Sequence, residues 1–332
     1  MTTCKIIICM PVFNDWESAN LLIPKIDRVF GRVPFEAELL IIDDGSTQAP
    51  PADFAQGVAS LKRVDILKLR RNLGHQRAIA VGLAYISEHR EYSAVQIMDC
   101  DGEDSPDDIP SLLARFSASH CKRVVFAKRQ IRNEGFLFKL FYQIFKVVHR
   151  CLTGRKIEVG NFSVIPAELV SRLVLYSETW NHYAASVFRA RIPFDLLPTT
   201  RARRIAGVSK MIFVDLVIHG LNAMSVFSPI VGVRLLVATL ILSVVSLSGL
   251  FILVVDRGGP DPQIPAWATI LTGLMTMFLL QTFFGVLLFL FTALHRREGV
   301  TFLLVRDYVH LVHKDVQVIT NACPPNIVLP SR

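Results

Sequence analysis

Short apolar runs alternate with amphipathic stretches over residues 5–129. Runs of strand length occur at residues 5–12, 37–44, 64–70, 94–99 and 123–129. Between them, the spacing of apolar positions predicts helices at residues 16–30, 75–88 and 107–117. Strands that alternate with helices in this way are typical of βαβ units. The pattern therefore predicts an α/β fold with a mostly parallel central sheet.

Two much longer apolar segments follow, at residues 231–255 and 267–294. Each exceeds the ~20 residues that a helix needs to cross a bilayer core. Their only charged residue is Arg234, which lies near an end where its stem can reach the headgroups. The chain is 52% apolar and only 19% charged, which favours membrane helices over the alternative, two core helices of a soluble protein.

The residues that flank these segments predict their topology. Residues 256–266 are short and rich in Gly and Pro, so the two segments should form an antiparallel hairpin. Basic residues precede the first segment and follow the second, which by the positive-inside rule predicts cytoplasmic domains at both ends. We expect a cytoplasmic α/β domain at 1–210, a juxtamembrane interfacial helix at 211–230, membrane helices at 231–255 and 267–294, an external loop at 256–266 and a cytoplasmic tail at 295–332.

Other features restrict the cellular context. Residues 136–155 combine an apolar face with basic side chains, which indicates either an interfacial amphipathic helix or a helix packed on its own domain. The start of the chain lacks the pattern of a cleaved secretory signal. Six cysteines without CxxC pairing are expected to be free thiols. The net charge is +8, but we expect a membrane rather than a nucleic acid as partner.

Polar side chains follow every predicted strand, in the sequences PVFND, DDGST, RRNLGHQ, DCDGED and AKRQIR. Ligands of open α/β sheets bind at the carboxyl ends of the strands. One polar strand end would be ordinary, whereas five indicate a ligand site for a nucleotide-like molecule. The carboxylates of IIDDGST would either accept hydrogen bonds from a base or ribose or form an Asx turn.

The stretch QIMDCDGEDSP holds the strongest chemical signal, because it places acidic residues directly after an apolar strand. Asp99 and Asp101 project to the same side of an extended segment, and two carboxylates suit an Mg²⁺ or Mn²⁺ ion that also binds a diphosphate. A solvated acidic loop is the alternative. Cys100 is expected to point inward. Three further acidic residues are expected to cap the helix that Ser105 and Pro106 open; they are Asp104, Asp107 and Asp108.

Six motifs occur together in a recognisable order: PVFND, IIDDGS, RRNLGHQRAIAVGLAY, DCDGEDSPDDIPSLL, GNFSVIP and RRIAGVSK. In order and spacing they resemble the family 2 glycosyltransferases of the GT-A fold. The apolar hairpin resembles the polyprenyl-phosphate subgroup, which includes dolichol-phosphate mannose synthases and bacterial undecaprenyl-phosphate glycosyltransferases. The resemblance covers residues 6–210, and the hairpin extends it.

This resemblance implies an inverting, metal-dependent transfer of a sugar from a UDP- or GDP-linked donor to polyprenyl phosphate at the cytoplasmic membrane. Mg²⁺ or Mn²⁺ is the implied cofactor, and a homo-oligomer through the membrane helices is an implied assembly. The implied nucleotide-sugar site comprises Pro11, Phe13, Asp15, Asp43, Asp44, Gly74, Asp99, Asp101 and Glu103. The implied metal ligands are Asp99, Asp101 and Glu103.

The acceptor phosphate has its own implied residues, namely Arg129, Arg132, Arg204, Ser209 and Lys210. Guanidinium and ammonium groups suit a lipid phosphate or a diphosphate, although membrane topology alone would also favour cations here. The implied catalytic set is Asp99, Asp101, Arg129, Arg204 and Lys210. The chain departs from the subgroup at Asp15, where Glu is commoner, and at Glu103, where Gln is frequent, which bears on metal preference and donor choice.

A polyprenyl phosphate is an anionic nucleophile, so the reaction requires no strong general base. His75, the only histidine within a motif, is therefore interpreted as structural. Two alternatives remain. A processive polysaccharide synthase of this fold would carry a Gln-x-x-Arg-Trp motif, which this sequence lacks. A non-catalytic membrane-anchored binding subunit is disfavoured by the intact acidic and basic strand ends.

Overall fold

The computed structural model describes residues 4–129, 136–155, 159–200, 202–207, 213–256, 266–295 and 302–321. The chain divides into two compact units. Unit 1 consists of residues 1–135, 157–226 and 302–332, and unit 2 of residues 136–156 and 227–301. In the described residues, unit 1 contains a sheet covered by helices, and unit 2 contains three helices.

The sheet of unit 1 has the strand order β7-β5-β6-β4-β1-β2-β3-β8 in the described residues. Strands β4, β1, β2 and β3 form a parallel block, β5 pairs in parallel with β7, and β6 and β8 are antiparallel to their neighbours. The predicted mostly parallel α/β sheet is confirmed. The strands are β1 (Lys5–Val12), β2 (Glu36–Asp43), β3 (Leu61–Lys68), β4 (Ala94–Ile97), β5 (Val124–Arg129), β6 (Ser163–Pro166), β7 (Phe194–Thr199) and β8 (Gln317–Asn321).

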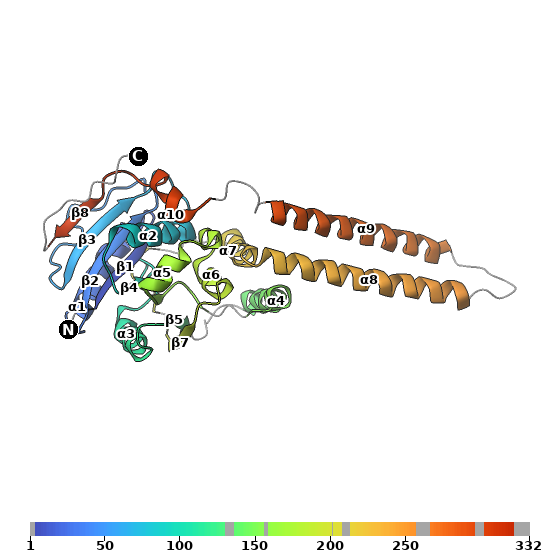
Figure 1. The fold of residues 1–332 in the computed structure, drawn as a ribbon, viewed down its shortest axis with the longest axis horizontal. Helices are drawn as coiled ribbons and strands as arrows, with labels where there is room; N and C mark the ends of the chain where they lie inside the picture. Colours follow the sequence, from blue (N-terminus) through green and yellow to red (C-terminus); the bar gives the residue numbers. More distant parts are fainter. Residues whose placement is uncertain are drawn as a thin grey trace. The chain divides into compact units, whose positions relative to one another are not determined.

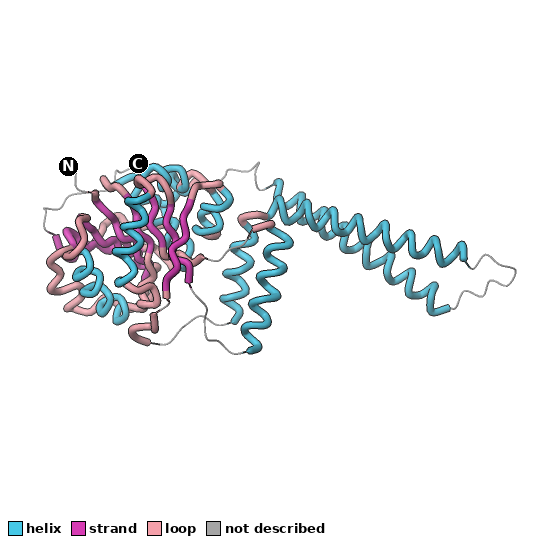
Figure 2. The backbone as a smooth tube through the Cα atoms, turned by 90° about the horizontal axis from the view of Figure 1, so that it is seen from below, coloured by secondary structure: helices cyan, strands magenta, loops and turns pink. Residues whose placement is uncertain are grey.

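Helices cover both faces of this sheet, because alternate side chains of its strands enter two different cores. In β1, Ile7 and Cys9 are buried in one core, whereas Ile6 and Ile8 are buried in the other. Figure 2 shows the strands as a magenta layer with cyan helices on its two sides. The helices of unit 1 are α1 (Trp16–Phe30), α2 (His75–His89), α3 (Ile109–Ala118), α5 (Ala167–Leu173), α6 (Tyr183–Arg189), α7 (Phe213–Ser225) and α10 (Leu304–Asp307), with 3₁₀ turns η1 (Pro106–Asp108), η2 (Ser177–Trp180) and η3 (Tyr308–His310).

The C-terminal segment completes the sheet, which the sequence did not indicate. Strand β8 pairs antiparallel with β3 at the edge, and Figure 1 shows the two side by side. Just before β8, the side chains of Leu304, Tyr308 and Val312 are buried in the same core as α2. The Tyr308 hydroxyl lies 2.6 Å from Nε2 of His89 in α2. Residues 302–321 are thus an integral part of unit 1.

Unit 2 contains α4 (Phe136–Thr153), α8 (Ser228–Asp256) and α9 (Ala266–His295). The helices α8 and α9 pack against each other, and α4 packs on α8. By length and composition, Ser228–Gly249 and Ile270–Thr292 could each cross a membrane. Nη1 of Arg234 in α8 donates to the carbonyl oxygen of Cys151 in α4 at 2.8 Å, so this cation stabilises the end of a neighbouring helix.

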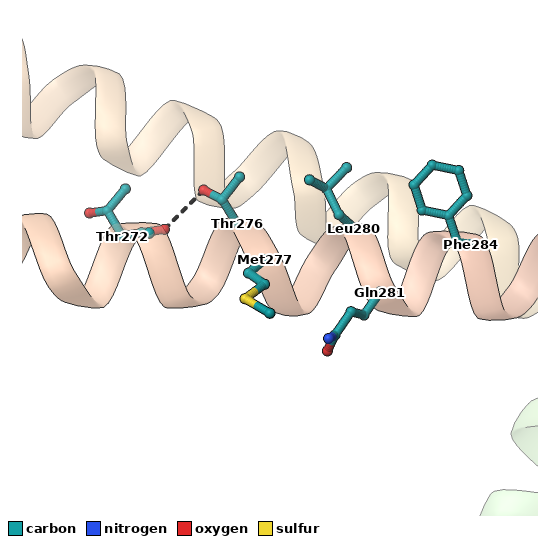
Figure 3. A pocket seen from close by; sticks show the side chains of 7 residues that line it. Thr272, Thr276, Met277, Leu280, Gln281 and Phe284 are labelled. Atoms are coloured by element: carbon teal, nitrogen blue, oxygen red, sulfur yellow. Dashed lines mark hydrogen bonds between the residues drawn. The ribbon is translucent and has the colours of Figure 1, made fainter.

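Several hydroxyl groups of α8 and α9 donate to carbonyl oxygens of their own helices. Thr272 and Thr276 each donate to the carbonyl four residues earlier, at 2.8 and 2.9 Å, and Figure 3 shows the second bond. Internal pairing of this kind is what a lipid environment requires of polar groups. A shallow groove runs along α9, lined by Thr272, Gly273, Thr276, Met277, Leu280, Gln281 and Phe284.

Replacing Tyr308 with Ala tests whether the C-terminal segment stabilises unit 1. Tyr308 is 2% exposed, so its truncation should leave a cavity and lower the free energy of unfolding by about 3–5 kcal/mol. This corresponds to a fall in melting temperature of roughly 6–20 °C, measured on the full chain in detergent. The neighbouring Val309→Ala is the matched control, because Val309 is 40% exposed. Equal melting temperatures for the two variants would contradict the assignment.

Candidate functional site

The polar strand ends meet at one edge of the sheet as predicted, because β4, β1 and β2 are adjacent and parallel. Their carboxyl ends therefore lie side by side. Asp15 follows β1, Asp43 ends β2, and Asp99 follows β4. Strands β4 and β5 both run antiparallel to β6, so they have the same direction. Arg129, the last residue of β5, therefore belongs to the same edge.

Asn14 joins the loop after β1 to the loop after β2. Its backbone has φ = 51°, a left-handed conformation that Asn tolerates better than most residues. Oδ1 of Asn14 accepts from the N–H of Thr47 at 2.9 Å, and the N–H of Asn14 donates to Oγ of Ser46 at 2.9 Å. The N–H of Ser46 donates to Oδ1 of Asp43 at 2.8 Å. Asp43 therefore makes the Asx-type turn that was one of the two interpretations of IIDDGST.

Asp44 stabilises a third loop. Its two carboxylate oxygens accept from the N–H groups of Leu73 and Gly74, at 2.7 and 2.9 Å. Gly45 permits this approach, because a Cβ at that position would lie 2.6 Å from the backbone of Arg71. Burial raises the pKa of Asp44, whereas the two N–H donors lower it by less. The carboxylate thus anchors the segment that leads into α2, and its expected contact with a base stays a prediction.

The acidic loop after β4 is braced by its own side chains. Oδ2 of Asp104 accepts from the N–H of Asp99 at 3.1 Å, and Oδ1 of Asp101 accepts from the N–H of Glu103 at 3.0 Å. Asp104, which was expected to cap the next helix, is buried and stabilises the loop instead. The expected role of Ser105 is confirmed, since its Oγ accepts from the N–H of Asp107 at the start of η1. Cys100 is buried as expected.

Residues 202–207 lie along this acidic loop. The N–H groups of Ala202 and Ile205 donate to the carbonyl oxygens of Glu103 and Asp101, both at 3.0 Å. The side chain of Ile205 packs directly on Gly102, where a Cβ would lie 2.3 Å from Cγ1 of Ile205. Gly102 also has φ = 80°, a conformation that favours glycine.

Arg204 is the residue of this segment that pairs with the carboxylates of the site. Its guanidinium pairs with the carboxylate of Asp15 and lies 3.3 Å from Oδ2 of Asp101, while its Nε donates to the carbonyl oxygen of Ala206 at 2.9 Å. Ser18 supports the arrangement, because its Oγ donates to Oδ1 of Asp15 at 3.0 Å. Arg204 is therefore the cation that joins the loop after β1 to the acidic loop.

One histidine contacts Asp99, and two others that are distant from each other in the sequence stack on each other. Nε2 of His75, at the start of α2, lies 3.1 Å from Oδ1 of Asp99. Desolvation lowers the pKa of His75, but the nearby carboxylates, Asp99 first, raise it by more, so the net shift is upward. The rings of His182 and His219 stack 4.7 Å apart, and burial lowers the pKa of His219. His75 was interpreted as structural, and the other two gave no sequence signal.

Some of the remaining expected site residues lie in the part of the chain that the structure describes, and others lie outside it. Pro11 lies in β1 opposite Ile42, and Phe13 follows β1 with 40% of its surface exposed. Gly74 precedes α2 and has φ = 92°. The residues expected near the acceptor phosphate after β5 and before α7 lie outside the described residues; they are Arg132, Ser209 and Lys210.

The acidic loop has a donor set that fits a shared metal site. In the described part of the chain, no group of three or more His, Cys, Asp and Glu side chains is arranged to hold a metal ion. Mg²⁺ commonly takes only one or two protein carboxylates and completes its shell with substrate phosphates and water. Asp99 and Asp101 fit that pattern.

Several known proteins are similar to this chain. The model of glycosyl transferase family 2 matches residues 7–183. A bactoprenol glucosyl transferase of Shigella phage SfV is 28% identical over 229 residues, which is 67% of this chain and 73% of that protein. The putative glycosyltransferase CsbB of Bacillus subtilis is 23% identical over 81% of this chain and 80% of its own. Glucosyl-3-phosphoglycerate synthase of Mycobacterium tuberculosis is 13% identical, with a TM-score of 0.49 over 69% of this chain and 80% of that chain.

Replacing Gly102 with Ala tests the contact between the acidic loop and residues 202–207. The added methyl group would overlap Ile205, so the amides of Ala202 and Ile205 should exchange with deuterium faster, as mass spectrometry can measure. Gly57→Ala is the matched control, because Gly57 has φ = 75° with no atom within 4 Å of its Cβ position. Both variants carry about 1–3 kcal/mol of backbone strain, and only Gly102→Ala carries the overlap. Unchanged exchange at both amides would disprove the contact.

Proposed function

The chain belongs to glycosyl transferase family 2, and from that premise we propose that it transfers a sugar from a nucleotide-diphosphate sugar to a polyprenyl phosphate. It is a glycosyltransferase of the hexosyltransferase class. The observation that carries the proposal is the pairing of Arg204 with both Asp15 and Asp101. It brings carboxylates that suit a metal-bound diphosphate together with a cation that suits a phosphate. The bactoprenol glucosyl transferases among its relatives support the choice of acceptor.

The donor would bind over the acidic loop. Asp99 and Asp101 are the proposed ligands of an Mg²⁺ or Mn²⁺ ion, with Glu103 as a further candidate. When bound, this ion neutralises the charge that develops on the departing diphosphate. Asp101 is also a partner of Arg204, so binding of a divalent cation would release the guanidinium to contact a phosphate oxygen. The acceptor phosphate is already anionic, so the residues of the site need only position it for attack on the anomeric carbon.

A lipid acceptor is compatible with the helix that follows residues 202–207. In α7, the side chains of Val217, Ile218 and Leu221 are 42–57% exposed. They recur at helical spacing and form an apolar stripe, as expected of a helix at a membrane surface. Helix α7 belongs to unit 1, the unit that holds the carboxylates.

The fold also supports the proposed topology. Strand β8 follows α9 in the chain and pairs with β3. Both strands must therefore lie on the same side of any membrane that the chain crosses, which requires an even number of crossings. Helices α8 and α9 supply two. Together with the basic flanks, this supports the proposal that both ends of the hairpin lie in the cytoplasm. A homo-oligomer through these helices remains a prediction.

The first test of the proposal is turnover with purified membranes, a panel of labelled UDP- and GDP-sugars, polyprenyl phosphate, and Mg²⁺ or Mn²⁺. One donor should yield labelled lipid. Asp101→Asn should lower the rate about 100-fold or more, because loss of several kcal/mol of charge stabilisation costs a factor of ten per 1.4 kcal/mol. The control Asp53→Asn removes the same charge from an exposed loop. No product with any donor would overturn the proposal, and label in polysaccharide rather than lipid would favour a synthase.

Labelling with a membrane-impermeant maleimide tests the topology in intact bacterial cells. A Gln263→Cys variant should react from outside, because residue 263 lies between the two predicted membrane helices. Cys121 is exposed on unit 1 and serves as the internal control, so it should react only after lysis. Peptide mass spectrometry identifies the labelled positions. Reaction of Cys121 in intact cells would place unit 1 outside.

A further inference from the structure

The loop between β3 and α2 is held from two sides by distant parts of unit 1. On one side, the two oxygens of the Asp44 carboxylate accept from the N–H groups of Leu73 and Gly74, at 2.7 and 2.9 Å. On the other side, residues 311–313 of the C-terminal segment lie against residues 68–70. The first side belongs to the nucleotide-sugar site that the sequence implied, whereas nothing in the sequence indicated the second.

Hydrogen bonds in both directions join the C-terminal segment to this loop. The N–H of Arg70 donates to the carbonyl oxygen of Leu311 at 2.9 Å, and the N–H of His313 donates to the carbonyl oxygen of Lys68 at 2.9 Å. The side chain of Arg70 adds a third bond, because its Nε donates to the carbonyl oxygen of Val312 at 3.0 Å. The start of the loop after β3 thus depends on partners from the opposite end of the chain.

Apolar packing joins the same two segments. Val312 forms an antiparallel bridge with Leu69, and both side chains are 1% exposed. They lie in one buried core together with Leu73, the residue whose N–H donates to Asp44. Burial of Val312 therefore stabilises the loop conformation in which the Asp44 carboxylate has its two backbone donors.

The position of Asp44 depends in turn on this loop. Asp44 is 3% exposed, and a buried carboxylate that loses its donors carries a large desolvation cost. A change in the loop that withdrew the N–H groups of residues 73 and 74 would therefore displace the carboxylate as well. The ends of β2 and β3 are adjacent at the ligand edge of the sheet. A nucleotide bound at this edge would meet a surface whose shape depends on residues 311–313.

We propose that residues 311–313 are a positioning element for the donor nucleotide: they hold the loop after β3 in the conformation that binds Asp44, and so keep this edge in the shape that binds the nucleotide. The inference rests on the proposed function, with its nucleotide-sugar donor. Val312 is the positioning residue, and it is too deeply buried to contact a ligand itself. Because the segment follows α9 in the chain, donor binding depends on residues beyond both apolar helices.

Replacing Val312 with Ala tests this inference. The truncation weakens the packing on Leu69, so a smaller fraction of the folded chain holds the loop in its binding conformation. The apparent dissociation constant rises as that fraction falls, and we expect it to rise about 5- to 10-fold for the bound nucleoside diphosphate. Val309→Ala is the matched control, because it makes the same change in the same segment at a residue that is 40% exposed, and it should leave the affinity unchanged.

The measurement is isothermal titration calorimetry of the full chain in detergent, with UDP and GDP as probes in the presence of Mn²⁺, well below the melting temperature of each variant. In hydrogen exchange, the amides of Leu73 and Gly74 should exchange faster in Val312→Ala. In turnover, the KM for the sugar nucleotide should rise and the KM for polyprenyl phosphate should stay unchanged. A purely structural defect would reduce the fraction of active protein, which lowers kcat and leaves both KM values unchanged.

A folded Val312→Ala whose nucleotide affinity stays within about twofold of the parent chain would overturn the inference. If that variant does not fold, Arg70→Met decides, because it removes the bond to residue 312 from an exposed side chain. Arg32→Met, at another exposed arginine, is its control. Weaker binding together with faster exchange at residues 73 and 74 supports the inference, whereas weaker binding alone indicates a direct contact with the ligand and contradicts it, as does unchanged binding.

The titration uses neither sugar nor lipid, so it separates this inference from the proposed function. A parent chain that binds a nucleoside diphosphate, and binds it less tightly as Val312→Ala, but makes no lipid product would sink the proposed function alone. A parent chain that makes lipid product while Val312→Ala keeps its nucleotide affinity would sink this inference alone. Binding of neither UDP nor GDP by the parent chain would overturn both.

Discussion

Carboxylates that gather at one edge of a sheet repel one another, and the partners that compensate this repulsion shape the whole candidate site. The structure uses two kinds of partner. Asp43 and Asp44 accept from backbone N–H groups, which are fixed parts of the fold. Asp15 and Asp101 share the guanidinium of Arg204, which belongs to a separate segment. The first kind of compensation is part of the backbone fold, whereas under the proposed function the second would be exchanged for a bound cation.

The kind of partner, backbone N–H or side-chain cation, distinguishes carboxylates that stabilise loops from those proposed to bind ligand better than residue type or exposure does. Asp104 is an aspartate like Asp99 and Asp101, but it is 3% exposed and accepts a hydrogen bond from the backbone of its own loop. Asp101 shares the same loop, yet its second oxygen faces a side-chain cation. Under the proposed function, a ligand that carries a divalent ion would compete with Arg204 for Asp101, while the carboxylates bound by N–H groups continue to stabilise the loops around it.

The sequence predicted the local elements well, because strand and helix periodicity is a local property. The helix at residues 16–30 matches its prediction at both ends, and the rule for parallel strand ends correctly indicated which loops meet. Contacts between distant segments were harder to predict. The pairing of His182 with His219 depends on how α6 and α7 pack, and the bond between Asp101 and Arg204 depends on the path of residues 202–207. Periodicity contains no information on either.

Strand β8 illustrates the same limit and adds a constraint on how the protein assembles. Its five residues would predict little by themselves, since the strand exists by pairing with β3 from the opposite end of the chain. The two apolar helices lie between these partners in the sequence. If α8 and α9 cross a membrane as proposed, unit 1 can complete its sheet and bury Tyr308 only after the second helix has returned the chain to the side on which β3 lies. Under that proposal the sheet itself requires two crossings, because a single crossing would leave the edge of β3 without its partner.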